Sequence, residues 1–321
     1  MNMGIVDFVR RWTLPSAIVT GAVCYGVFAV TPALDEIGDR MASVFDVLFP
    51  FSVFATLFVT FSKVNFHKMM PRRWHLWTAL MQMVLVGGCV SVILLTDMDA
   101  DLRLTWEAVL TCVIAPCASA APVVTGKLGG DINGMTTFTL LSSLLCAVTI
   151  PLVFPMVEKA ADVTFVEASL TILEKLAMVM LLPLALGWIV RHYVHSVYRY
   201  IMRHPNLGFY CWSVSLAITT GITLKNIVHS EASGWVLIWI AAGSMLVCLM
   251  QFAIGRLIGR WQKEIINCGQ GMFQKNTAMA IWVSYMYLNP VASIGAGCYV
   301  LWQNIVNSME ISRKMKETGM N

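Results

Sequence analysis

The chain has 321 residues, of which 58% are apolar and 12% charged, and its mean hydropathy is +0.71. Soluble domains carry about 45–50% apolar and roughly 25% charged residues, so this composition excludes a soluble globular protein. The formal net charge of +4 says little by itself, and we expect no nucleic-acid partner. We therefore expect an integral membrane protein whose main partner is the lipid bilayer.

Apolar runs long enough to cross a bilayer recur along the whole chain, since a span needs about 20 mostly apolar residues. We identify ten such runs, at approximately 13 to 31, 42 to 62, 75 to 96, 105 to 127, 132 to 156, 168 to 191, 207 to 228, 234 to 258, 264 to 288 and 290 to 312. The polar regions between them are too short to form a soluble domain. The nine cysteines are scattered singly through these runs, which is typical of small buried apolar residues rather than disulfides or a zinc site.

The positive charges predict an orientation, because lysine and arginine collect in short cytoplasmic loops. With the amino terminus inside, they divide about sixteen to five between the inner and outer loops, and Lys275 remains inside the membrane. We therefore expect a multi-pass protein, of a bacterial inner membrane, with both termini in the cytoplasm. Such a chain can form two five-span halves of opposite orientation, 1 to 160 and 161 to 321, which is a recurrent transporter architecture.

The fourth apolar run contains residues that interrupt helices. Pro116 and Pro122 each remove a backbone donor and clash with the preceding turn, at a cost of ~3 kcal/mol in a helix interior. The residues between them, 117 to 121, are small and allow another backbone to come close. We therefore predict a broken helix here.

The ninth run, at the same ordinal place in the second half, is also expected to be broken. Gly269 and Gly271 flank Gln270, and each glycine costs ~1 kcal/mol relative to alanine inside a helix. A break at membrane depth is tolerated where it is buried in protein or faces a water-filled cavity. We predict that the two breaks cross each other near the middle of the membrane.

Two motifs resemble a known family. The end of the chain reads "FQKNTAMAIWVSYMYLNPVASIGAGCYVLWQNIVNS", in which an amide-rich stretch opens a helix and a last helix contains Trp302, Gln303 and Asn304. The second motif is "PCASAAP" at 116 to 122, followed by a Gly-Gly-Asp turn and a Ser/Thr-rich run. With these motifs the whole chain resembles the bile acid:sodium symporter family, and more broadly the superfamily shared with auxin efflux carriers and arsenite permeases. The resemblance implies an all-α fold of ten helices in two inverted repeats with crossing broken helices.

The resemblance also implies two sodium sites, which this chain keeps only in part. The positions of the first family site are occupied here by Ala121, Pro122, Met135, Thr139 and Gln270, so that Thr139 alone keeps an oxygen of the same kind. The glutamines of the second family site are matched by Gln82 and Gln274. The family's carboxylate position holds Gln270, and its asparagine position holds Lys275. The sodium sites therefore look degraded, and we expect neither a cofactor nor a resident metal.

Lys275 offers a reason for that loss. Two like charges ~4 Å apart repel by about 4 kcal/mol at an effective dielectric of 20, which would empty an adjacent weak cation site. The ammonium could instead take the place of sodium between the crossing helix ends, and a buried lysine that releases its proton would permit proton-linked transport. The alternative is that Lys275 reaches an interface or pairs permanently with an acid, although its place about twelve residues into the ninth run makes the former difficult.

We therefore predict a secondary active transporter of a small organic anion, a carboxylate or a bile-acid-like compound, that works by alternating access and is sodium-independent or proton-linked. The alternatives are a sodium-coupled symporter of the same fold, a non-transporting receptor or scaffold, and an arsenite-type permease in which Cys117 would be a soft ligand. We expect no enzyme, because no phosphate-cradling loop or Ser/His/Asp constellation is present. The predicted binding residues are Gln82, Ser119, Thr125, Thr139, Gln270, Gln274, Lys275, Asn276 and Asn304.

Overall fold

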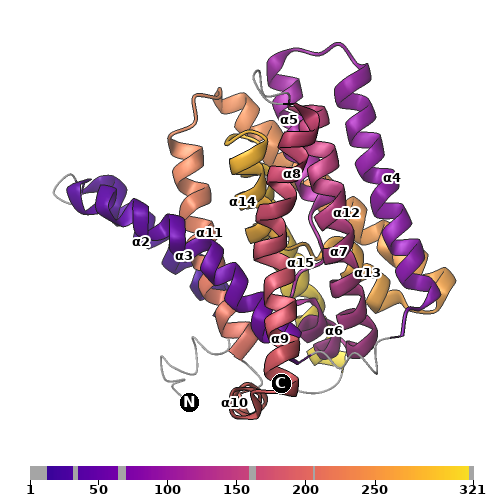
Figure 1. Ribbon diagram of the computed structural model, residues 1–321. Helices are drawn as coiled ribbons and strands as arrows, with labels where there is room; N and C mark the ends of the chain where they lie inside the picture. Colours follow the sequence, from indigo (N-terminus) through magenta and orange to yellow (C-terminus); the bar gives the residue numbers. More distant parts are fainter. Residues whose placement is uncertain (1–12, 32–34, 64–69, 159–163, 205–206, 318–321) are drawn as a thin grey trace.

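The computed structural model describes residues 13 to 31, 35 to 63, 70 to 158, 164 to 204 and 207 to 317, and over these ranges the chain forms a bundle of helices without strands (Figure 1). In chain order the helices are α2 (Thr13–Val30), α3 (Asp35–Ser62), α4 (Arg73–Leu95), α5 (Ala100–Ile114), α6 (Ala121–Lys127), α7 (Ile132–Val157), α8 (Phe165–Leu176), the π-helical turn η3 (Ala177–Leu181), α9 (Leu182–His192), α10 (His195–Arg203), α11 (Leu207–Val228), α12 (Gly234–Gln262), α13 (Ile265–Phe273), α14 (Thr277–Tyr287) and α15 (Ser293–Glu317). The predicted all-α class is confirmed for this part of the chain.

Three of the described helices are long and apolar enough to cross a membrane by themselves, namely α4, α7 and α12. Shorter apolar stretches, Ser16–Val30 and Pro50–Ser62, lie in α2 and α3. Large apolar side chains remain exposed on the outside of the bundle, as on α4, where Val84 is 64% exposed. Lipid tails are as apolar as these side chains, so such a surface is suited to a bilayer. The chain is a membrane protein, as its composition predicted.

The helices pack in two groups. α11 lies against α2 and α3, and α3 also packs against α9. The second group consists of α4, α5, α7, α12, α13 and α15, with α6 and α14 attached to α7 and α15. α8 is joined through η3 to α9 and so belongs with the first group. The groups meet where α8 packs against α7 and where α11 lies against α15. The main apolar core includes Ile114, Phe273 and Tyr299 in the second group, all nearly inaccessible.

Small residues bring the helices of the second group close together. A Cβ added to Gly255 in α12 would lie 2.5 Å from the carbonyl oxygen of Cys268 in α13. A Cβ added to Gly295 in α15 would lie 2.5 Å from the carbonyl oxygen of Ala108 in α5. Both glycines therefore permit a backbone approach that any side chain would prevent.

Two of the predicted spans are broken, each into two short helices. The first break lies between α5 and α6 and contains Pro116, as predicted. Pro122 does not break a helix, because it lies in the first turn of α6, where a missing amide proton costs nothing.

The predicted breaks at Gly269 and Gly271 also need correction, because both residues lie inside α13 and the second break comprises 274 to 276. These glycines permit close packing instead. A Cβ at Gly269 would lie 3.1 Å from Cγ of Arg256, and one at Gly271 would lie 3.0 Å from the ring of Phe138.

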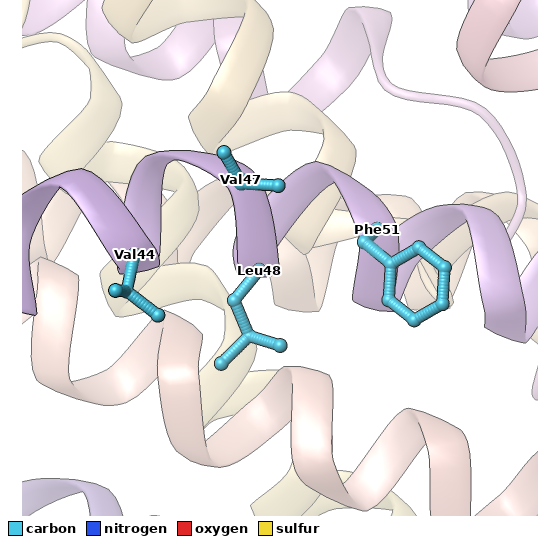
Figure 2. Close-up of a pocket in the computed structure, with 4 residues that line it drawn as sticks. All are labelled: Val44, Val47, Leu48 and Phe51. Atoms are coloured by element: carbon cyan, nitrogen blue, oxygen red, sulfur yellow. The ribbon is translucent and has the colours of Figure 1, made fainter.

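A hollow of about 410 Å³ lies on the outside of α3, away from both breaks. Val44, Val47, Leu48 and Phe51 line it, and all four project from this one helix (Figure 2). Its apolar lining and its place on an exposed helix face suit contact with lipid tails rather than recognition of a polar ligand.

Candidate functional site

The two helix breaks meet as a short antiparallel pair. The backbone nitrogen of Ala118 donates to the carbonyl oxygen of Gln274 at 2.8 Å, and that of Asn276 donates to the carbonyl oxygen of Pro116 at 2.8 Å. Cys117 and Lys275 face each other between these two bonds. In such a non-hydrogen-bonded pair the side chains lie close together, so the thiol and the lysine chain leave the crossing side by side.

The backbone amides of the two central residues do not bond within the pair. Each donates to a side chain of a neighbouring helix. The nitrogen of Cys117 donates to Oγ of Ser142 in α7 at 2.9 Å. The nitrogen of Lys275 donates to Oε1 of Gln303 in α15 at 2.9 Å, and Nε2 of Gln303 donates back to the carbonyl oxygen of Lys275 at 3.3 Å. Buried backbone polar groups need such partners, particularly where no water reaches them.

The carboxyl end of α5 is satisfied by side chains from other helices. The last carbonyls of a helix have no partner within it and carry the negative end of the helix dipole. Nε2 of Gln82, in α4, lies 3.3, 3.4 and 3.1 Å from the carbonyl oxygens of Val113, Ile114 and Ala115. Nζ of Lys275 donates to the carbonyl oxygen of Val113 at 3.1 Å. The ammonium group is therefore bound at the negative end of α5.

Lys275 is buried, with 1% of its surface exposed, so it does not extend to an interface. The ion pairs of the described residues do not include it. The buried acid of α5, Glu107, is bound by Nε of Arg103 at 3.0 Å. A buried charge is costly unless it is paired or hydrogen-bonded, and in the described structure a helix end supplies that partner.

The end of α13 has a different partner set, which sequence analysis did not identify. The hydroxyl of Tyr299 donates to the carbonyl oxygen of Phe273 at 2.7 Å, and Nε2 of Gln251 donates to the Tyr299 oxygen at 3.0 Å. A signal was present, because Gln82 and Gln251 are both preceded by Leu-Met within apolar runs. A lone amide in an apolar helix predicts a buried hydrogen bond.

Several predicted binding residues belong to this crossing through backbone or side-chain contacts. Asn276 begins α14, where its Oδ1 accepts from the nitrogen of Met279 at 3.3 Å. Oγ1 of Thr139 lies 3.7 Å from Sγ of Cys117 and donates to the carbonyl oxygen of Met135. Ser119 is buried in the first break.

Other predicted residues supply buried polar atoms without hydrogen-bond partners among the described residues. They are both side-chain polar atoms of Gln274, Oε1 of Gln82, Oε1 of Gln270, Oγ1 of Thr125 and Oδ1 of Asn304. Both polar atoms of Asn307, three residues beyond Asn304 on α15, share this state and were not predicted. Buried polar groups are nearly always paired in proteins, so such atoms mark places where a ligand or water can bind.

The chemistry of these atoms is that of neutral oxygen and nitrogen groups beside one cation. Amide oxygens are suitable ligands for a hard cation, but a carboxylate to balance its charge is missing from the residues that sequence analysis placed here. Among the described residues, no group of three or more His, Cys, Asp or Glu residues is arranged to hold a metal ion. Neutral amide groups of this kind suit a polar solute or a weakly bound hard cation.

An ionic cluster ties the ends of the broken helices to α4. Nη1 of Arg72 lies 2.9 Å from Oδ2 of Asp131, before α7, and 3.1 Å from Oε1 of Glu264, before α13. The Asn267 side chain donates to the carbonyl oxygen of Asp131 at 2.7 Å and accepts from its nitrogen at 2.9 Å. These contacts fix the turn after α6 against α13.

Comparison with known proteins identifies the family of this chain. A family model described as "Sodium Bile acid symporter family" matches residues 47 to 230, which is more than half of the chain. The matched range includes the first break and ends before the second, so Lys275 lies outside it. A search of the curated proteins gives no significant match.

Proposed function

The chain belongs to the sodium bile acid symporter family, and from this premise we propose that it is a secondary active transporter of small organic anions. We propose further that its ten spans form two inverted repeats that alternate access to the crossing from either side of the membrane. We also propose a bacterial inner-membrane location, and the distribution of basic residues supports an orientation with both termini in the cytoplasm.

The observation that carries this proposal is the position of the Lys275 ammonium group. It lies inside the crossing, 3.1 Å from a carbonyl oxygen at the end of α5, in the segment where the resemblance places bound sodium. A covalently held cation at that place would stabilise the helix end as a mobile ion does, and would repel sodium from the adjacent amides. We therefore propose that transport is sodium-independent or coupled to protons through Lys275.

The class of substrate follows from charge. The amino end of α14 lies at the crossing, beginning at Thr277. Helix amino ends attract anions, and discontinuous helices in transporters direct these ends toward anionic substrate groups. Together with Lys275 this helix end favours a carboxylate, with Gln270, Gln274 and Asn304 available for hydrogen bonds to it.

A sodium-coupled symporter remains the second candidate, and the unpartnered amide oxygens favour it. Oε1 of Gln82, Gln270 and Gln274 are all buried, and each could ligate a hard cation. In this case Lys275 would be a structural bridge between α5 and the second break. The two candidates differ in what happens when sodium is removed.

The test is uptake of a labelled bile acid, and of a labelled short-chain carboxylate, by proteoliposomes that contain the full chain. We expect uptake to persist when choline replaces sodium, whereas loss of uptake would establish the sodium-coupled candidate. The variant Lys275→Asn/Gln270→Glu restores the family residues at these two positions beside Gln82 and Gln274, and its uptake is expected to become sodium-dependent. Binding of these probes without uptake under either condition would instead indicate a receptor.

A further inference from the structure

α10 (His195–Arg203) has no role in the crossing and was not among the predicted spans. It follows the end of α9 at His192 and precedes α11, which begins at Leu207. Figure 1 shows α10 nearly end-on at one end of the bundle, while α9 and α11 run along the bundle. α10 therefore lies across the helices, at the level where they leave the membrane.

The two faces of α10 differ in chemistry. Because residues three and four apart share a helix face, His195, Arg199 and Arg203 form one basic side. Val197 and Ile201 lie on the opposite side, and Met202, three residues after Arg199, lies at the edge of the basic side. Ile201 is buried against the bundle, whereas Val197 and Met202 are 40% and 49% exposed. A short helix with separate basic and apolar faces beside a span is typical of helices that lie in the membrane interface.

The basic face has no acidic residue near it in the sequence, because none occurs between Glu174 and Glu231. Arg199 and Arg203 are both exposed. Nε of Arg199 donates to the carbonyl oxygen of His195, one turn earlier in the same helix, at 3.3 Å. In the described part of the chain neither arginine belongs to an ion pair. Both charges are available to an external anion.

Aromatic residues next to this face also suit the headgroup region. Tyr193 and Tyr200 are 69% and 57% exposed, and tyrosines of this kind collect where one end of the ring is apolar and the other is wet. The guanidinium group of Arg191 lies 5.4 Å from the ring centre of Tyr198, which helps to hold α10 against the end of α9.

We propose that α10 is an interfacial helix that binds the phosphate groups of anionic phospholipids through Arg199 and Arg203. Val197 contacts the upper part of the acyl chains, and Met202 lies at the boundary between the two faces. A soluble acidic protein is a poorer occupant. It could pair with the arginines, but the exposed apolar residues beside them lie at the level of the bilayer, where lipid already covers them. The lipid contact anchors the end of α9 and, through it, α3, against which both α9 and α10 pack.

The test is native mass spectrometry of the purified full chain in mild detergent with either phosphatidylglycerol or phosphatidylcholine. The wild-type chain is expected to bind phosphatidylglycerol more tightly. Arg199→Gln/Arg203→Gln should weaken this binding by about 30-fold, because each arginine near an anionic surface contributes about a five-fold change in affinity. Arg199→Lys/Arg203→Lys, which keeps both charges, should stay within a few-fold of wild type.

The matched control is Arg313→Gln/Lys316→Gln, which removes two exposed charges from the end of α15 and should leave the lipid preference unchanged. Equal losses in the two double variants would overturn the proposal, because they would reflect net charge alone. Equal binding of the two lipids by the wild-type chain would also overturn it and would leave a soluble acidic partner as the occupant of the basic face.

Discussion

The two helix breaks share a backbone arrangement and differ in side-chain chemistry. In each, the amide of the central residue, Cys117 or Lys275, is accepted by a side-chain oxygen 2.9 Å away. Behind each, a glutamine of a long helix contributes to the partners of the preceding helix end, Gln82 directly and Gln251 through Tyr299. The shared arrangement meets the demand of buried backbone groups for partners, which applies to both breaks equally.

The difference lies in what each break presents. The first, 115 to 120, contributes small or weakly polar side chains and follows the carbonyl end of α5, which accepts from Gln82 and Lys275. The second, 274 to 276, contributes two amides and an ammonium group. The helix end before the first break thus accepts a hydrogen bond, and the charged side chain of the second break donates it. Backbone requirements therefore define the shape of the crossing, and a single lysine makes its chemistry asymmetric.

The largest expected effect on uptake comes from removing the charge of Lys275, which makes the two breaks different. Lys275→Met keeps the length of the side chain and removes its charge, so uptake in proteoliposomes should fall at least ten-fold. Stability should fall little or even rise, because a buried charge without a carboxylate partner is costly to fold. Thermal unfolding in detergent measures the second effect.

Cys117→Ala provides the matched change on the opposite side of the pair. It removes an uncharged side chain, so uptake should remain within about two-fold of wild type. Comparable losses of uptake in the two variants would show that packing at the crossing, rather than the charge, is what transport requires.

A second comparison concerns the two glutamines. Gln82→Leu leaves the carbonyl oxygen of Ala115 without its donor, and a buried unpaired acceptor costs about 1–3 kcal/mol. Gln251→Leu should cost less, since the carbonyl oxygen of Phe273 keeps its bond to the Tyr299 hydroxyl. Thermal unfolding of both variants in the same detergent measures the difference. If Gln251→Leu is the more destabilising, α13 rather than α5 depends on its glutamine.

Much of this arrangement could be predicted from the sequence, and the limits have physical causes. Composition and the apolar runs predicted the helical membrane fold, and Pro116 marked the first break because proline cannot continue a helix. The glycines of α13 were misleading, since glycine serves both to weaken helices and to admit close neighbours such as Phe138. Only the packing of α13 against other helices distinguishes these uses.

The binding residues show the same limit. Lys275 could be identified because a lysine within an apolar run is expensive, whatever surrounds it. Its partner could not, because the carbonyl oxygen of Val113 belongs to the backbone and carries no mark in the sequence. Tyr299 and Asn307 were missed for a related reason, since their burial depends on how α15 packs against other helices, which the sequence does not show.

The smallest expected effect concerns how the second half of each broken helix begins. Oδ1 of Asn276 caps α14, so Asn276→Ala should lower stability by about 1 kcal/mol, and Asn276→Ser, which keeps a capping oxygen, should restore most of it. The corresponding residue before α6, Ala120, has helical backbone angles of φ −82° and ψ −13° and no side-chain cap. Ala120→Ser should therefore add no stability in thermal unfolding, because a side-chain cap requires a non-helical backbone at that position. A gain at Ala120 equal to the loss at Asn276 would mean that the two helix starts are equivalent, and that the asymmetry of the crossing is confined to the lysine.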